Sequence, residues 1–219
     1  MAKRQRPESG NHPVTYTRER VVDAAFELIR ESGWQSVSAR AIAERLGSST
    51  MPIYSHLRSI AEVERALREK ARVLLRDYQT RQWTPDPLMD MAFGYIAFAR
   101  DERHLFRFLY LERPDVVDEE TLGKLSDSLD EQFGPDSAQA TALAQLDASA
   151  HGALVTHTWI FTHGLAVLVS SGALGECSDE TILGFLGNAG EAFYLWAAGR
   201  SGAEPPAESP ANGGTDDEG

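Results

Sequence analysis

The chain has 219 residues, of which 42% are hydrophobic and 25% are charged, a composition typical of soluble globular proteins. Its single cysteine, Cys177, excludes an intrachain disulfide, and no run reaches the roughly 18 to 20 uninterrupted apolar residues of a membrane span. We therefore expect a cytoplasmic protein with no membrane partner. The net charge of −12 is unevenly distributed along the chain. Residues 1–58 carry nine basic and six acidic side chains, whereas the whole chain carries 21 basic and 33 acidic ones. A weakly basic segment on an acidic body would present one face to phosphate, although a chance fluctuation also explains these numbers.

The N-terminal part predicts a flexible arm followed by three short helices. Residues 1–15 are polar and show no periodicity. Beyond them, apolar residues recur at three- and four-residue spacing in three stretches. Gly33 and Gly47 are placed to end the first two helices, and Ser38 suits the N-cap of the second. We expect one small domain over residues 16–58, with helices at residues 17–32, 38–46 and 49–56.

Residues 59–200 predict a larger helical body. Ser59 and Glu62 form a capping box at the start of a helix that continues to about residue 78. Segments containing proline and glycine separate the helices that follow, and no alternating pattern predicts a strand. Residues 201–219 are rich in proline, glycine and acids, and we expect a disordered acidic tail. The predicted fold class is all-α, with further helices at about residues 87–110, 115–132, 136–172 and 178–199, the third being long enough for a break near Gly152.

The stretch from Ser38 to Leu57 has the pattern of a helix-turn-helix. Its first helix has one apolar face, the turn at Gly47 redirects the chain, and Ile53 anchors the following helix. The side chains left outward on this second helix are mostly small or able to form hydrogen bonds. A helix held in this way can place its N-terminal side chains in the major groove of DNA.

Four sequence features occur here in a fixed order. They are Gly33-Trp34, then Ser38-Ala39-Arg40-Ala41-Ile42-Ala43-Glu44, then Gly47, then Ile53-Tyr54-Ser55-His56-Leu57. In this combination the chain resembles the TetR family of bacterial transcriptional repressors over residues 17–63. Two positions depart from the family pattern, since Leu57 stands where phenylalanine is usual and Ile60 where many members have a lysine that contacts phosphate.

The resemblance implies a sequence-specific regulator that binds double-stranded operator DNA. Ser38 could instead act only as an N-cap, and Tyr54 could instead pack in the core. Arg58 could supply the charge that Ile60 lacks. The implied contacts are Ser38 and Arg40 with phosphate, Thr50, Met51 and Pro52 in the major groove, Tyr54 and His56 with the DNA backbone, and Ser49 and Arg58 beside them.

A homodimer is expected because one recognition helix reads only a few base pairs. Two copies, spaced by about one turn of DNA or a multiple of it, would read a palindromic operator. The two most apolar segments, 145–172 and 178–199, are the candidates for the dimer seam, and glycines at three-residue spacing in the second would allow close helix packing. A buried core within one chain also explains these residues. The predicted seam residues are Leu165, Leu168, Ile182, Phe185 and Phe193.

Trp159 and His163-Gly164 resemble a Trp-x-x-x-His-Gly signature of one branch of the TetR family, the WHG-type C-terminal domain. Trp159 and His163 lie one helical turn apart on one face. The histidines at 151, 157 and 163 do not share a face, and no carboxylate pattern accompanies them, so we expect no metal site. We expect His163 to be a structural residue at or near the dimer seam.

A pocket for a hydrophobic or aromatic effector is expected in the helical body. Residues 91–110 are rich in aromatic side chains, and a pocket lined by them would suit a flat molecule. A plain helical core explains each aromatic residue as well. The candidate lining residues are Phe93, Phe106, Tyr110, His151 and Trp159.

These features favour a repressor that a small molecule releases from its operator. Such a ligand must bind the arrangement that does not bind DNA more tightly than the one that does. The sequence shows no glycine-rich phosphate loop, nucleophile elbow or Cys–His pairing, so we expect no catalytic residue and no cofactor. The alternative is a helical interaction or adaptor protein that kept the fold and lost DNA binding, an interpretation that Ile60 keeps open.

Overall fold

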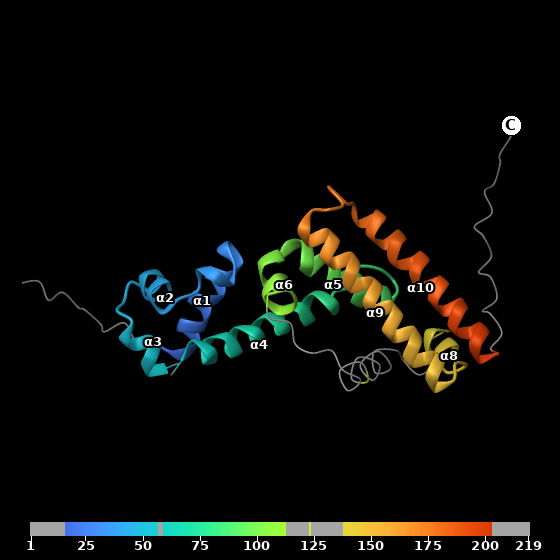
Figure 1. Cartoon of the computed structure of the whole chain (residues 1–219), viewed down its shortest axis with the longest axis horizontal. Coiled ribbons are helices and arrows are strands. Elements are labelled where there is room, and N and C mark those ends of the chain that lie inside the picture. Colours follow the sequence, from blue (N-terminus) through green and yellow to red (C-terminus); the bar gives the residue numbers. More distant parts are fainter. Residues whose placement is uncertain (1–15, 57–58, 113–122, 124–137, 203–219) are drawn as a thin grey trace, which may run out of the picture. The chain divides into compact units, whose positions relative to one another are not determined.

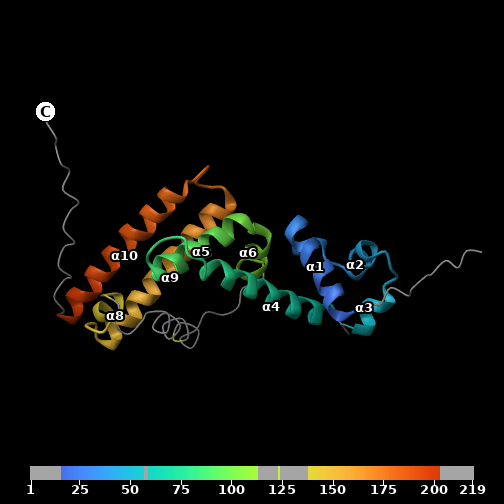
Figure 2. The same ribbon diagram turned by 180° about the vertical axis from the view of Figure 1, so that it is seen from behind.

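The computed structural model describes residues 16–56, 59–112, 123 and 138–202, and every regular element in these ranges is a helix (Figures 1 and 2). The all-α fold class is thereby confirmed. The chain divides into two compact units, one ending at Lys70 and the other beginning at Ala71. This division lies inside helix α4 (Ile60–Gln79), which therefore contributes to both units. The arm, residues 203–219 of the tail and most of the helix expected at 115–132 lie outside the described residues, and Ser201, expected in the tail, instead ends the last helix.

The first unit is built from short helices whose ends are set by local hydrogen bonds. Helix α1 begins after Thr17, whose hydroxyl accepts the N–H of Arg20 at 3.3 Å, and ends at Gly33, where φ is 79°. The positive φ explains why a glycine stands there. The elements before α4 are α1 (Arg18–Ser32), the 3-10 helix η1 (Trp34–Ser36), α2 (Ala39–Leu46) and α3 (Met51–His56).

The turn between α2 and α3 orients the third helix. Gly47 has a left-handed φ of 62°, and the N–H of Ser48 donates to the carbonyl of Ala43 at 2.9 Å. Both features are those of a glycine C-cap. Helix α3 contacts α1 and α2, and buried apolar side chains from these helices and from α4 form the core of the first unit. This core consists of Val21, Ala25, Ile29, Ile42, Ile53, Val63 and Leu67.

Helices α5, α9 and α10 pack side by side in the second unit, with α6 against α5 and α9. The stretch expected as one helix at 87–110 is two, because Glu102 leaves helical geometry at ψ 45°. The bend allows both flanks to bury aromatic rings, among them Phe98 and Phe106. The helices are α5 (Pro87–Asp101), α6 (Arg103–Tyr110), α8 (Ala138–Leu143), α9 (Ala148–Ser171) and α10 (Asp179–Ser201).

The stretch expected at 136–172 is also interrupted, but before Gly152. The break lies between α8 and α9, where the Asp147 carboxylate accepts the N–H of Ala150 at 2.8 Å and so starts a new helix. By length and composition alone, α9 could cross a membrane, since Ala148–Ser170 has a mean hydropathy of 1.4. The threonines and histidines in α9 therefore do not lower its mean hydropathy below that of a possible membrane span, contrary to the expectation from the sequence. In the second unit, α9 packs against α5 and α10.

The connection between α4 and α5 is held by the buried carboxylate of Asp90. This group accepts the backbone N–H of Trp83 at 3.0 Å and that of Thr84 at 2.6 Å. The indole N–H of Trp83 donates to the carbonyl of Tyr78 at 2.9 Å. Gly94 lies against the same carbonyl, and a Cβ at this position would lie 2.3 Å from its oxygen. The close approach of α4 and α5 therefore requires a glycine at 94.

Candidate DNA-binding helix and ligand cavity

Helix α3 has a buried side and an exposed side. Ile53 is 2% exposed and anchors the helix, whereas Met51 is 77% exposed and Tyr54 is 56% exposed. The alternative that Tyr54 packs in the core is therefore wrong. Ser49 and Thr50, which precede the helix, are exposed as well. The structure thus presents these four side chains on the outside of the first unit.

Of the other residues expected to contact DNA, the structure describes the side chains of Ser38 and Arg40 but not those of Pro52, His56 and Arg58. Ser38 is the N-cap of α2, with its hydroxyl accepting the N–H of Ala41 at 3.1 Å, and both Ser38 and Arg40 are exposed. Pro52 and His56 belong to α3, but their side chains are not among the described ones, and Arg58 lies outside the described residues. The contacts of Ser38, Arg40, Pro52, His56 and Arg58 with DNA stay predictions.

Arg45, which the sequence did not single out, has a structural role beside this surface. Its guanidinium donates two hydrogen bonds to Glu31, at 2.7 and 2.5 Å, and so ties α2 to α1. The hydrogen bonds from Arg45 lower the pKa of the Glu31 carboxyl. A pairing 14 residues apart in sequence has no local signal that could have predicted it.

A shallow depression lies where the first turns of α2 and α4 meet α3. It has a volume of about 210 Å³ and is bordered by the two N-cap serines, Ser38 and Ser59, by Tyr54 and by Ile60. Ser59 accepts the N–H of Glu62 at 3.2 Å, as the capping pattern predicted. Helix N-termini favour anions, so the depression suits a phosphate group despite the apolar Ile60.

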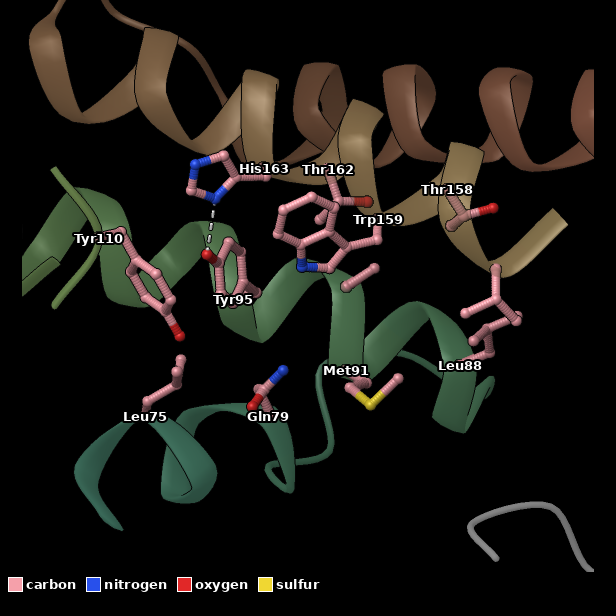
Figure 3. Close-up of a pocket in the computed structure, with 12 residues that line it drawn as sticks. Leu75, Gln79, Leu88, Met91, Tyr95, Tyr110, Thr158, Trp159, Thr162 and His163 are labelled. Carbon is pink, nitrogen blue, oxygen red and sulfur yellow. Dashed lines mark hydrogen bonds between the residues drawn. The ribbon is translucent and has the colours of Figure 1, made fainter. Parts of the chain in front are cut away.

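The second unit contains a cavity of about 230 Å³ between α4, α5, α6 and α9 (Figure 3). Aromatic rings form much of its wall. Trp159 and His163 stack with their ring centroids 5.3 Å apart and an interplanar angle of 12°. The full lining is Leu75, Gln79, Leu88, Met91, Ala92, Tyr95, Tyr110, Val155, Thr158, Trp159, Thr162 and His163.

Tyr95 and His163 form an uncharged pair in this wall. The Tyr95 hydroxyl and His163 Nδ1 are 2.9 Å apart and share a hydrogen bond. Burial raises the pKa of Tyr95, with Tyr110 adding to the shift, and burial lowers the pKa of His163. Both groups are therefore neutral at pH 7. Because the Tyr95 hydroxyl already has a partner, it is less available to a bound molecule.

The cavity includes some of the expected ligand-binding residues and not others. Tyr110 and Trp159 line it. Phe93 and Phe106 do not, because they are almost fully buried, Phe106 packing behind Tyr95 and Tyr110. His151 is not among the lining residues either. His163 also lines the cavity, where it bonds Tyr95, and its expected position at or near the dimer seam stays a prediction.

A second cavity of about 220 Å³ lies between α5, α9 and α10. The two cavities share four lining residues, Leu88, Ala92, Thr158 and Thr162, which form the seam between α5 and α9. The Thr162 hydroxyl is buried in this seam with no hydrogen-bond partner among the described residues. The second cavity has two acidic residues in its lining, Asp86 and Glu191, whereas the first has no acidic or basic residue other than His163.

Helices α9 and α10 also expose an apolar surface. Of the expected dimer residues, Leu168 and Phe185 are exposed and Phe193 is partly buried against a cluster that includes Leu146 and Leu154. Leu165 and Ile182 are buried in the core of the chain, so they are not available for a seam. We define the outer apolar face as the exposed residues Ile160, Leu168, Phe185, Leu195 and Trp196.

The glycines of α10 do not bring helices together within the chain. A Cβ at Gly184 or Gly190 would meet nothing within 4 Å, and at Gly187 only the Met89 side chain, at 3.9 Å. The expectation that these glycines permit close helix packing at a dimer seam stays a prediction.

The lowered pKa of His163 predicts a loss of stability in mild acid. Its folded-state pKa is below the ordinary 6.5, so below about pH 6.5 the unfolded chain takes up a proton that the folded chain does not. The free energy of unfolding should therefore fall with pH below 6.5 until the folded-state pKa is reached. Urea unfolding at pH 7.0 and 5.5 tests this, with His163→Gln expected to show a smaller decrease. An equal decrease in both proteins would contradict the prediction.

The first unit is similar in sequence to known regulatory proteins. Residues 21–67 match the family described as bacterial regulatory proteins, tetR family. An uncharacterised helix-turn-helix-type transcriptional regulator of Mycobacterium tuberculosis is 30% identical over 69 residues, which are 29% of this chain and 32% of that protein. The aligned stretch thus spans about a third of the relative's length.

Two solved structures from Rhodococcus sp. RHA1 have a similar fold. A protein of unknown function superimposes with a TM-score of 0.62 at 17% identity, covering 86% of this chain and 99% of that one. A TetR-like transcriptional regulator superimposes with a TM-score of 0.54 at 19% identity, covering 84% and 96%. Residues 21–67 are therefore similar to the domain of the bacterial tetR regulatory family, and the fold as a whole is similar to that of a TetR-like regulator.

Proposed function

We propose that the chain is a transcriptional repressor that binds operator DNA as a homodimer and is released by a small-molecule effector. The observation that carries the proposal is the exposed face of α3, with Met51 and Tyr54 outward and Ile53 buried, in a domain matched to the tetR regulatory family. A large exposed methionine and tyrosine next to Ser49 and Thr50 suit contact with base edges and sugars.

Phosphate contacts come from the edges of the same surface. Ser38 and Ser59 place two helix N-termini beside one depression, and Arg40 is exposed on α2. The positive ends of the helix dipoles attract phosphate there, which compensates for the missing charge at Ile60. The proposed DNA contacts are Ser38, Arg40, Ser49, Thr50, Met51, Pro52, Tyr54, His56 and Arg58.

The dimer is proposed to form through the outer apolar face of α9 and α10. Phe185 and Trp196 are 11 residues apart, close to three helical turns, and therefore lie on one side of α10. Covering this face with a second copy removes apolar surface from water, and it accounts for the apolar character of α9 without a membrane. A twofold dimer implies a palindromic operator, and a DNA-binding regulator belongs in the cytoplasm.

The effector is proposed to bind in the first cavity, where α4 supplies Leu75 and Gln79. Helix α4 also supplies Val63 and Leu67 to the core that supports α3. A ligand that favours another position of α4 would thus lower the affinity for DNA, provided that it binds that arrangement more tightly. Trp159 and His163 meet in the cavity wall, which supports assignment to the WHG branch of the family.

Salt-dependent binding to the DNA upstream of the protein's own gene tests the proposal. The affinity of the native protein should fall steeply with salt, and Arg40→Ala should weaken binding by about tenfold or more and reduce the salt slope by about two per dimer. Tyr54→Ala should weaken binding to a similar extent. Arg103→Ala, an exposed arginine of the second unit, is the matched control and should leave the affinity unchanged.

The adaptor alternative predicts a different result in the same assay. An exposed Ile60 where a phosphate-binding lysine is usual favours that alternative. A folded native protein that binds upstream and random DNA equally weakly at physiological salt would support the adaptor and overturn the repressor.

A further inference from the structure

The first cavity has no formal charge in its wall. None of its lining residues is acidic, lysine or arginine, and its one histidine is neutral because burial lowers the pKa of His163. A charged molecule in this site would lose part of its hydration and gain no counter-charge, which costs free energy. The wall therefore selects against ions of either sign.

The size and shape of the cavity limit further which uncharged molecules can bind there. An apolar cavity of about 150 Å³ holds one benzene ring. A cavity of about 230 Å³ is half as large again and so has room for about ten ring atoms. Trp159, Tyr95 and Tyr110 present ring surfaces to this space, which suits a flat aromatic molecule.

Gln79 is the polar group best placed to bind such a molecule. Figure 3 shows its amide directed into the space between Tyr95 and Met91. The structure gives this amide no hydrogen-bond partner among the described residues. The Tyr95 hydroxyl is engaged by His163, and the Thr162 hydroxyl is buried in the seam between α5 and α9. An amide can both donate to and accept from a ligand.

We propose that the cavity binds an uncharged bicyclic aromatic compound carrying one hydroxyl or carbonyl group, and that Gln79 determines this specificity by hydrogen-bonding that group. The regulatory meaning of the site rests on the proposed function, whereas binding itself does not. Because Gln79 belongs to α4, the polar group of the ligand contacts the helix that continues into the first unit.

Isothermal titration calorimetry on the full-length protein at pH 7 tests the proposal with two matched pairs of probes. Naphthalene and 2-naphthol differ by a hydroxyl, and 2-naphthamide and 2-naphthoate are nearly the same shape but differ in charge. We expect 2-naphthol to bind about tenfold more tightly than naphthalene, the factor that one net hydrogen bond supplies. We expect 2-naphthoate to bind at least about 100-fold more weakly than 2-naphthamide.

Variants isolate the contribution of Gln79. Gln79→Leu should bind naphthalene as the native protein does and lose the preference for 2-naphthol, and Gln79→Met is the second variant if leucine impairs folding. Gln82→Leu, an exposed glutamine outside the cavity, should keep the preference. Equal binding of 2-naphthoate and 2-naphthamide, an unchanged preference in folded Gln79→Leu, or no binding of any probe would overturn the proposal. A protein that binds 2-naphthol but not DNA would overturn the repressor function alone.

Discussion

Gly94→Ala is expected to destabilise the second unit by about 3 kcal/mol or more, at the upper end of the cost of overpacking a core. The added Cβ would lie 2.3 Å from the Tyr78 carbonyl oxygen, 2.7 Å from its carbon and 2.8 Å from the Cα of Gln79. All three are backbone atoms, so no side-chain rotation relieves the overlap. Helices α4 and α5 would have to separate, and the cavity that they share would change shape.

Urea unfolding followed by circular dichroism measures the effect, and 2-naphthol binding reports on the cavity. Gly187→Ala is the control, since its Cβ would make an ordinary 3.9 Å contact with Met89. Alanine is favoured over glycine in a helix by about 0.5–1 kcal/mol, so this variant should be as stable as the native protein or slightly more so. Native-like stability of Gly94→Ala would show that α4 and α5 do not approach as closely as described.

Phe185→Glu is expected to separate the dimer and, with it, to weaken operator binding by about 10²- to 10⁴-fold. The side chain is 44% exposed within one chain, so a glutamate there can remain in water in the monomer. In the proposed dimer the same charge would be buried in an apolar seam without a partner. Two linked recognition helices bind far more tightly than one, which sets the size of the loss in DNA affinity.

Light scattering after size exclusion gives the molar mass of the variant, and fluorescence anisotropy gives its affinity for operator DNA. Val73→Glu is the matched control, because Val73 is 51% exposed on α4 and lies outside the outer apolar face. It should leave both the mass and the affinity as they are in the native protein. If Phe185→Glu ran as a dimer, the seam would have to lie elsewhere on the chain.

The sequence predicted the first unit well because its signals are local. Glycines with positive φ end α1 and α2, and serine N-caps begin α2 and α4, so each boundary follows from one or two residues. The outward Tyr54 and the inward Ile53 follow from helical periodicity in the same way. The Arg45–Glu31 pair could not be predicted, since it joins two helices across the fold.

The second unit was harder to predict because hydrophobicity does not distinguish a core from a cavity or from an interface. Phe106 and Tyr110 lie one turn apart on α6, yet Phe106 is buried in the core and Tyr110 lines the cavity. Likewise, Ile182 and Phe185 lie one turn apart on α10, and only Phe185 is exposed. These differences depend on how α5, α9 and α10 pack, which no single helix specifies.

The hydrogen bonds of Asp90 affect how the joint between α4 and α5 can move. Both N–H groups that it accepts belong to the segment joining α4 to α5, and Trp83 of that segment is itself bonded to the last turn of α4. These three hydrogen bonds restrain the joint between α4 and α5, so we expect it to bend little. If a molecule binds beside Gln79 as we propose, we therefore expect any displacement to move α4 together with this joint, and not to change the angle between α4 and α5.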